Sequence, residues 1–214
     1  MKITFILIGV MVAIFIAQTL VAGFTEEFAL TPEKAIGGHP WQFLTYMFLH
    51  GDEVHIFLNM FVLLIFGITV ENVLGTRKYI LLFIIAGLGS SLIYLAITAL
   101  ISSPTEFLFN MRIPMLGASG AVFGIMAVYG FLYPRNWIVM FPGIPMPAIV
   151  AVFVFAGFEI FYGLSGSQPG IANWGHLGGI IVGIVFILIV KYRKKLHEKK
   201  FTTKSEREFE FVFD

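Results

Sequence analysis

One serine of this chain, Ser119, stands between glycines in the segment MLGASGAVFG, residues 115–124. A serine hydroxyl becomes a strong nucleophile when a nearby base removes its proton, and histidine is a common base for that purpose. His176, in the glycine-rich segment GHLGG, is a candidate base. Taken alone, a serine in an apolar helix more often bonds a neighbouring backbone carbonyl and only fills space. The question is therefore which polar groups the fold brings to Ser119.

A second polar pair, His55 and Asn59, has the spacing of one helical turn. Residues four apart lie on the same face of an α-helix. An imidazole ring and a carboxamide can both donate hydrogen bonds, and acyl transfer needs donors aimed at the oxyanion that develops in the transition state. The pair is thus a candidate for oxyanion stabilisation beside a serine nucleophile.

The composition determines the environment of these residues. Hydrophobic residues make up 58% of the 214 residues and charged residues only 13%, against roughly 45–50% and 25% in soluble globular domains. The chain is therefore a membrane protein. It has no cysteine, which excludes disulfides, zinc–thiolate sites and cysteine nucleophiles. The net charge of +1 indicates no particular class of partner, and we expect no nucleic acid to bind.

Six apolar stretches have about the length needed to cross the hydrocarbon core as helices. They are residues 3–23, 54–74, 78–101, 117–133, 147–164 and 171–192, and the first is too long for the core of a signal peptide. The predicted fold class is all-α, a polytopic membrane bundle of six transmembrane helices. We expect one membrane domain over residues 1–192 and a charged cytoplasmic tail over residues 193–214.

Lysine and arginine residues predict the orientation, because they are retained in cytoplasmic loops. With the N-terminus inside, twelve of them lie on the inner side, namely the eight from Lys191 onward together with Lys2, Arg77, Lys78 and Arg135. Only Lys34 and Arg112 then lie outside. Both termini are cytoplasmic in this topology, and the external loops are residues 24–53, 102–116 and 165–170.

In this topology Ser119, His176 and the His55/Asn59 pair all lie near the outer ends of their helices. Polar groups in lipid are costly and usually face a bundle interior or a cavity, so their shared depth suggests a site. Glycines at four-residue spacing, at 120 and 124 and at 175, 179 and 183, let helices approach closely. If these rows pack together, the hydroxyl and the His176 imidazole come within hydrogen-bond reach. No carboxylate at this level has a clear claim to orient the histidine, which indicates a dyad.

Taken together, these motifs resemble those of the rhomboid intramembrane serine proteases, in their basic six-helix prokaryotic form. GASG at 117–120 is similar to the family's GxSG nucleophile motif, and HIFLN at 55–59 is similar to its HxxxN element. GHLGG at 175–179, followed by Gly183, is similar to the family's AHxxGxxxG-type sixth helix. Each motif alone is weak, but three in order on the expected helices are specific. The resemblance covers essentially the whole six-helix core.

The resemblance implies a role for each matched residue. Ser119 becomes the nucleophile and His176 the general base and acid, with Asn59 and His55 stabilising the oxyanion. The supporting residues are the glycines around the site and an aromatic ring that stacks on the histidine: Gly117, Gly120, Gly175, Gly179 and Phe123. Glu71 resembles an acidic residue near the inner end of the family's second helix.

One departure from the family pattern lies in the first outer loop. Family members often carry a Trp-Arg pair there, whereas this chain has Trp41-Gln42 within WQFLTYMFLH. The change removes the arginine's charge from any contact of the loop with lipid and does not touch the chemistry. We expect this aromatic segment, which is too short to span, to be half submerged at the interface. Glu159, inside the fifth stretch, is expected to face an interior hydrogen-bond partner rather than to take part in catalysis.

The expected function is that of an intramembrane serine endopeptidase, which cleaves single-span transmembrane proteins near the external end of their membrane segment. Its expected partners are these substrates and the lipid of the cell membrane, with no cofactor and no metal, and its oligomeric state stays open. Two alternatives also stay open. One is a transporter or metal-binding membrane protein that uses His39, His50, His55 and His176. The other is a rhomboid-like protein that binds transmembrane segments without cutting them.

Overall fold

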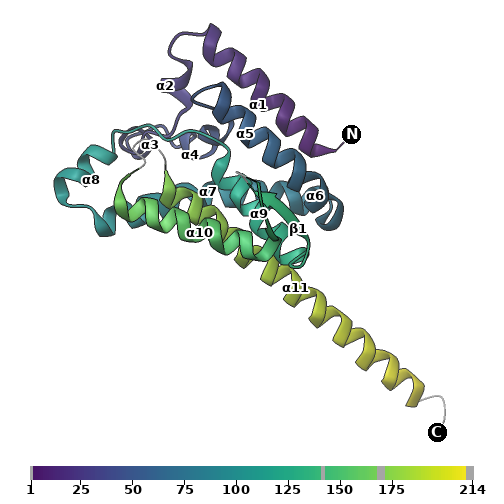
Figure 1. Cartoon of the computed structure of the whole chain (residues 1–214). Coiled ribbons are helices and arrows are strands. Elements are labelled where there is room, and N and C mark those ends of the chain that lie inside the picture. The colour runs from purple at the N-terminus through teal and green to yellow at the C-terminus, as the bar shows by residue number, and fades with distance from the viewer. Residues whose placement is uncertain (1, 141–142, 168–171, 211–214) are drawn as a thin grey trace.

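The computed structural model describes residues 2–140, 143–167 and 172–210, and it is a helical bundle from which the last helix projects (Figure 1). The helices of the bundle are α1 (Ile3–Leu20), α5 (Glu53–Val62), α6 (Ile68–Leu74), α7 (Thr76–Ile101), α9 (Ser119–Leu132), α10 (Ala148–Ser165) and α11 (Asn173–Glu210). A π-helical segment, η2 (Leu63–Gly67), joins α5 to α6. The connections contain the short elements α2 (Phe24–Phe28), α3 (Pro32–Ile36), α4 (Gln42–Thr45), η1 (Tyr46–Phe48), α8 (Pro104–Asn110), β1 (Trp137–Met140) and β2 (Ile144–Pro147).

Five helical segments are long and apolar enough to cross a membrane: α1, α5 to α6 taken together, α7, α10, and α11 as far as Lys195. The predicted fourth span, α9, has only 14 residues and so extends about 21 Å at 1.5 Å per residue. Nine of its residues are buried, and it contacts α7, α10 and α11. The helical membrane bundle is confirmed, whereas the count of six spans depends on this short interior helix and stays a prediction.

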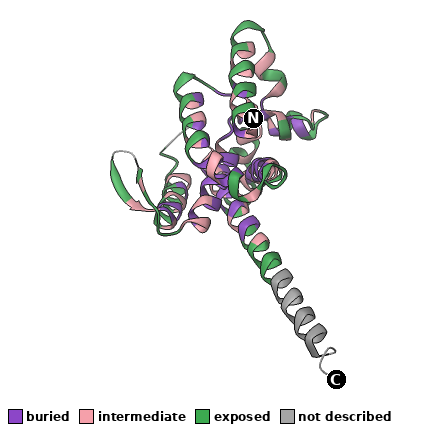
Figure 2. Cartoon of the chain, turned by 90° about the vertical axis from the view of Figure 1, so that its right-hand side faces the viewer, coloured by how far each residue is buried: buried purple, intermediate pink, exposed green. Residues whose placement is uncertain are grey.

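Buried residues concentrate where the helices meet, and the outward faces carry exposed side chains (Figure 2). Many of these exposed side chains are large and apolar, among them Phe57, Leu92 and Phe153. In water such a surface is unfavourable, because apolar area gains free energy by leaving water. In hydrocarbon it carries no such penalty, so the outward faces are suited to contact lipid.

The centre of the bundle is the close contact between α9 and α11. A side-chain carbon added to Gly179 would overlap the backbone of Gly120, and one added to Gly183 would overlap the backbone of Gly124. The two backbones can touch only because these positions lack side chains. The two glycine rows do pack together, as the sequence predicts.

A buried carboxylate attaches α1 to the rest of the bundle. Glu71 of α6 accepts hydrogen bonds from the backbone N–H groups of Ile3 (2.9 Å) and Thr4 (3.1 Å) and from the Thr4 hydroxyl (2.7 Å). The first N–H groups of a helix lack partners within it, and the helix dipole there favours negative charge. Glu71 therefore caps α1 from a neighbouring helix, which is a structural role.

The first outer loop packs onto the bundle. Tyr46 is fully buried and its hydroxyl donates to the carbonyl of Gly87 in α7 (2.7 Å). Burial raises the pKa of Tyr46 to about 12, so the phenol remains a donor. Gln42 is also fully buried, and its amide accepts from the N–H of Thr31 (3.1 Å) and donates to the carbonyl of Glu27 (3.0 Å). In this chain the glutamine that replaces the family's usual arginine therefore holds the loop together.

The irregular stretch before Ser119 is held by the same loop. The backbone N–H and C=O of Met115 pair with those of Leu30 at 2.8 and 2.9 Å, and the N–H of Gly117 donates to the Tyr46 carbonyl at 3.0 Å. Non-helical chain at membrane depth is tolerated where protein surrounds it, and Met115 is buried. The start of α9 is thus fixed by backbone hydrogen bonds.

Two features were not predicted. Strands β1 and β2 form a small antiparallel hairpin over the expected inner loop, with Trp137 opposite Pro147. Proline is tolerated there because it removes no hydrogen bond that a central strand would need. Helix α11 also continues past residue 192, the predicted domain boundary, as one helix to Glu210. The division into a membrane domain and a tail stays a prediction.

Gly179→Val is expected to lower the thermal stability, because the new side chain would force α11 away from α9. Overpacking of this kind typically costs about 1–3 kcal/mol, and here rigid backbone is the obstacle. The measurement is the unfolding temperature of the protein in detergent. Gly9→Val in α1 is the matched control, since a side-chain carbon at Gly9 meets nothing within 4 Å. A Gly179→Val protein as stable as the control would contradict the close contact.

Candidate active site

Ser119 and His176 meet at one end of the contact between α9 and α11. Ser119 is the first residue of α9, and His176 lies in the first turn of α11. His176 Nε2 is 2.8 Å from Ser119 Oγ, which is a hydrogen-bond distance. The touching glycine rows set this separation, because bulkier residues would hold the helices apart. The hydrogen-bond contact expected from the glycine spacing is therefore present.

The N-terminus of α9 adds backbone donors beside Ser119. The first four N–H groups of an α-helix have no partner within it, and the helix dipole gives this end a partial positive charge. The chain enters α9 through Gly117, whose φ of +127° is one that L side chains rarely adopt. A side-chain carbon on Gly117 would also lie 2.8 Å from the His55 ring. Only glycine lets the chain turn here with His55 against it.

His55 and Asn59 approach this turn from α5. The Asn59 amide is buried and donates one of its two N–H groups to the His55 carbonyl at 3.0 Å. The second N–H group of Asn59 is left to donate elsewhere. His55 Nδ1 accepts from the N–H of Gly51 at 3.4 Å, so the neutral ring carries its proton on Nε2. That Nε2 edge is the part of the ring that lies against Gly117. Both side chains therefore keep a donor on the side of the candidate site.

An aromatic ring covers one face of the His176 imidazole. Phe123, one turn along α9 from Ser119, stacks on it with ring centroids 4.8 Å apart and planes at 28°. Phe155 of α10 meets Phe123 edge-on at 5.8 Å. Such packing restricts rotation of the imidazole, so Nε2 stays directed at Ser119. The stacking that the family resemblance implies for Phe123 is present.

A carboxylate lies beside the other nitrogen of His176. Oε1 of Glu159, in α10, is 3.2 Å from Nδ1, and the two side chains are only 14% (His176) and 11% (Glu159) exposed. From the sequence, no carboxylate at this level has a clear claim to orient His176, whereas the structure places Glu159 next to its Nδ1, in line with the expectation that Glu159 faces a polar group in the interior. Sequence gives the position of Glu159 along its helix, but it does not give the rotation of α10 about its axis against α11.

One cavity connects these residues. Its volume is about 1160 Å³, and its lining includes Ser119, His176, His55 and Asn59. It also reaches Glu106 of α8, in the loop that follows α7. The four polar residues singled out from the sequence thus face one shared space, which is large enough for an extended segment of chain and for water.

His39 and His50 lie in the first outer loop. Within the described ranges, no group of three or more His, Asp or Glu side chains could hold a metal ion. The His50 ring packs against His55 with centroids 5.2 Å apart, and the His39 ring packs against Trp41 at 4.8 Å. In the described part of the chain, His39 and His50 are therefore packed against neighbouring rings.

Sequence reasoning also missed the contribution of α7. A side-chain carbon on Gly120 would overlap the Ser90 side chain, and one on Gly175 would come within 3.1 Å of Ser90 Oγ. Ser90 therefore fills the space where α9 and α11 begin to touch. The signal was available in GLGSS, residues 87–91, a run of small residues in an apolar stretch.

Comparison with known proteins establishes the family. The family model described as the Rhomboid domain matches residues 37–193, which is most of the chain. The chain therefore belongs to the rhomboid family.

Several named proteins are similar to this chain. The chain is 28% identical to "RHOMBOID-like protein 6, mitochondrial" of Arabidopsis thaliana, over 76% of this chain and 48% of that protein. It is 31% identical to "RHOMBOID-like protein 12, mitochondrial" of the same plant, over 75% and 49%. It is 28% identical to "Rhomboid protease GluP" of Bacillus subtilis, over 78% and 28%. The chain thus spans about half the length of these relatives or less.

Next to the site, His50 is held in an environment that disfavours its charge. Burial, followed by the neighbouring His55, lowers the pKa of His50 from 6.5 to about 4, against smaller raising effects of a Phe48 backbone hydrogen bond and of Asp52. Between these pH values the unfolded chain binds a proton at His50 that the folded protein does not bind. Stability therefore falls as the pH drops from about 6.5 to about 4, and it stops falling below that.

His50→Phe is expected to reduce this acid sensitivity, because phenylalanine keeps the ring contact and cannot take up a proton. The difference between 6.5 and about 4 corresponds to roughly 3 kcal/mol of unfolding free energy. The measurement is the unfolding temperature in detergent from pH 7.5 to pH 4. His39→Phe is the control and should keep the wild-type slope. Equal slopes for His50→Phe and wild type would contradict the assignment.

Proposed function

We propose that this chain is an intramembrane serine endopeptidase, with Ser119 as nucleophile and His176 as general base and acid. The observation that supports this most directly is the 2.8 Å contact between Ser119 Oγ and His176 Nε2 within an apolar helical bundle. Rhomboid family membership supports intramembrane protease activity in general. The assignment of roles to individual residues rests on the geometry of this chain.

In the proposed reaction, Ser119 Oγ attacks the carbonyl carbon of the scissile peptide bond while His176 Nε2 takes the hydroxyl proton. The imidazolium then gives that proton to the leaving amine, and the other half of the substrate remains as an ester on Ser119. A water molecule, deprotonated by the same Nε2, attacks the ester carbonyl, and the imidazolium returns this proton to Ser119 Oγ as the bond between Oγ and the acyl carbon breaks and the carboxylic acid leaves. Both Ser119 and His176 are then restored, and the cycle needs neither a metal nor a cofactor.

The proposed oxyanion donors come from two helices. The N–H groups at the start of α9 supply a partial positive charge beside Ser119. On α5, the second N–H of Asn59 and the Nε2–H of His55 are available on the same side. Donors that are fixed before the reaction stabilise the transition state without reorganising, which is why such groups matter for rate.

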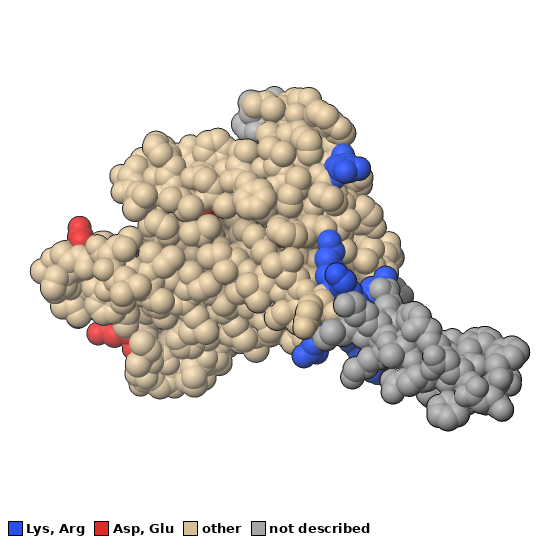
Figure 3. All heavy atoms as spheres, turned by 90° about the horizontal axis from the view of Figure 1, so that it is seen from below, with Lys and Arg blue, Asp and Glu red and all other residues tan. Residues whose placement is uncertain are grey.

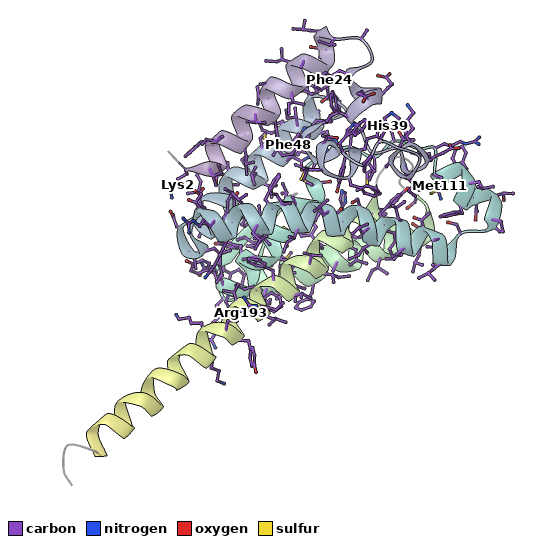
Figure 4. The ribbon with its side chains drawn as sticks, turned by 180° about the vertical axis from the view of Figure 1, so that it is seen from behind. Lys2, Phe24, His39, Phe48, Met111 and Arg193 are labelled. Atoms are coloured by element: carbon purple, nitrogen blue, oxygen red, sulfur yellow. The ribbon has the colours of Figure 1, made fainter. Side chains whose placement is uncertain are left out.

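We propose that both termini are cytoplasmic and that the site opens to the external side. Basic side chains gather on the side from which α11 projects, and acidic side chains lie away from it (Figure 3). Lys2 and Arg193 lie on one side of the bundle, and His39 and Met111 lie on the other (Figure 4). Lysine and arginine are retained on the cytoplasmic side, so the side of Lys2 and Arg193 is the inner one.

The proposed substrates are single-span membrane proteins of the cell membrane, cleaved near the external end of their span. Ser119 and His176 lie at the outer ends of their helices in the proposed topology. A helix shields its carbonyls, so the substrate must unwind before Ser119 can attack. Gly and Pro, which cost about 1 and 3 kcal/mol within a helix, favour such unwinding. Substrate and lipid are the proposed partners of the membrane domain, residues 1–192.

Ser119→Ala is expected to abolish cleavage of a model single-span substrate in proteoliposomes, because it removes the nucleophile. The measurement is the appearance of product fragments on gels, with their termini mapped by mass spectrometry. Ser91→Ala is the matched control, since the Ser91 hydroxyl is buried in α7 and donates to the Leu88 carbonyl (2.9 Å). Equal cleavage by Ser119→Ala and wild type would refute the proposal. Binding of the substrate without cleavage by wild type would favour a non-proteolytic rhomboid-like protein.

Asn59→Ala is expected to slow turnover without abolishing it. Loss of one oxyanion donor typically lowers the rate by about 10²–10³, or roughly 2.7–4 kcal/mol, and other donors remain. The measurement is kcat for the model substrate. Asn72→Ala tests whether any loss of an amide has this effect, because Asn72 lies in the same span, where its side chain is bonded to Lys2. Undiminished turnover in folded Asn59→Ala would remove Asn59 from the site.

A further inference from the structure

We propose that Glu159 is a positioning residue for His176, so that the site works as a Ser–His–Glu arrangement rather than as a dyad. This inference rests on the proposed function of Ser119 and His176 and adds a third group to it. Glu159 belongs to α10, a helix that supplies neither the nucleophile nor the base. The juxtaposition that supports the proposal is Glu159 Oε1 at 3.2 Å from His176 Nδ1, with Ser119 Oγ at 2.8 Å from Nε2 of the same ring.

The two ring nitrogens of His176 must play opposite roles: Nε2 must accept a proton, and Nδ1 must carry one. A carboxylate beside Nδ1 favours this arrangement. For Nε2 to accept the proton of Ser119, the neutral imidazole must carry its own proton on Nδ1. A carboxylate beside Nδ1 favours that tautomer and then stabilises the imidazolium that forms. Without such a group, the tautomer protonated on Nε2 is available, and in it Nε2 cannot take the proton.

The surroundings of Glu159 favour this role. Its other oxygen, Oε2, is buried and has no hydrogen-bond partner within the described residues, and the same is true of His176 Nδ1. An ionisable side chain within a spanning helix is costly and usually faces a polar partner in the interior. The partner that Glu159 faces is the imidazole of the candidate site. Its contact is not yet aligned as a hydrogen bond, and catalytic contacts often tighten only when substrate binds.

The other neighbours of His176 leave its Nδ1 side to Glu159. Phe123 stacks on the ring, and Ser119 lies at Nε2. A purely structural alternative is that Glu159 merely fastens α10 to α11. That alternative predicts a loss of stability alone, whereas a positioning role predicts a change in the state of the imidazole ring itself.

The first test compares Glu159→Gln with wild type on the model single-span substrate in proteoliposomes. The isosteric amide keeps the packing but loses the charge, so we expect kcat to fall at least tenfold while KM stays within twofold. Glu71→Gln is the matched control, because Glu71 is the other buried carboxylate of the described spans and bonds α1 instead of the site. A kcat for Glu159→Gln within threefold of wild type would overturn the proposal, as would an equal loss in Glu71→Gln.

The second test measures which ring nitrogen of His176 carries the proton, and it needs no substrate. In protein labelled with ¹⁵N-histidine, the His176 signals are assigned by their loss in His176→Gln. We expect a ring protonated on Nδ1 in wild type and Glu71→Gln, and a shift toward protonation on Nε2 in Glu159→Gln. Identical ring signals in wild type and Glu159→Gln would overturn the proposal. This readout separates the two hypotheses, because it can succeed even if no substrate is cleaved, in which case only the proposed protease function fails.

Discussion

The contact on which the rest of this structure depends is the touching of two backbones, where α9 meets α11 at Gly120 and Gly179 and again at Gly124 and Gly183. Helices in lipid gain nothing from hiding apolar surface from water, so they associate through close packing and polar contacts. Without side chains between them, the first turns of both helices converge. The separation of 2.8 Å between Ser119 Oγ and His176 Nε2 is a consequence of that approach.

The second constraint is that every polar group inside the bundle needs a partner. The Glu71 carboxylate accepts from N–H groups at the start of α1, and the Gln42 amide pairs with backbone groups of the first loop. In the irregular chain before α9, the backbone groups of Met115 pair with those of Leu30. These contacts pair their polar groups within the protein, whereas Glu159 Oε2 and His176 Nδ1 are among the buried atoms that have no hydrogen-bond partner in the described residues. A buried polar atom without a partner needs an explanation, and at a candidate active site a change of partner during the reaction is one.

Much of the bundle could be predicted, because its signals are local in the chain. Apolar runs fix where helices form, since each backbone group must be paired within lipid. The four-residue spacing of glycines at 120, 124, 179 and 183 fixes which helix faces can touch. The spacing of His55 and Asn59 puts them on one face of their helix, and both do line the cavity with Ser119 and His176.

The sequence by itself determined a membrane protein of the all-α class, the helix faces that meet, and the polar residues near one depth. Only the tertiary structure decided that α9 is a short interior helix, that Gln42 is buried, and that the Glu159 carboxylate lies at His176 Nδ1. The physical reason is that local patterns fix periodicity and depth along each helix. The rotation of one helix against another, and hence which side chains meet, is set by the packing of all the helices at once.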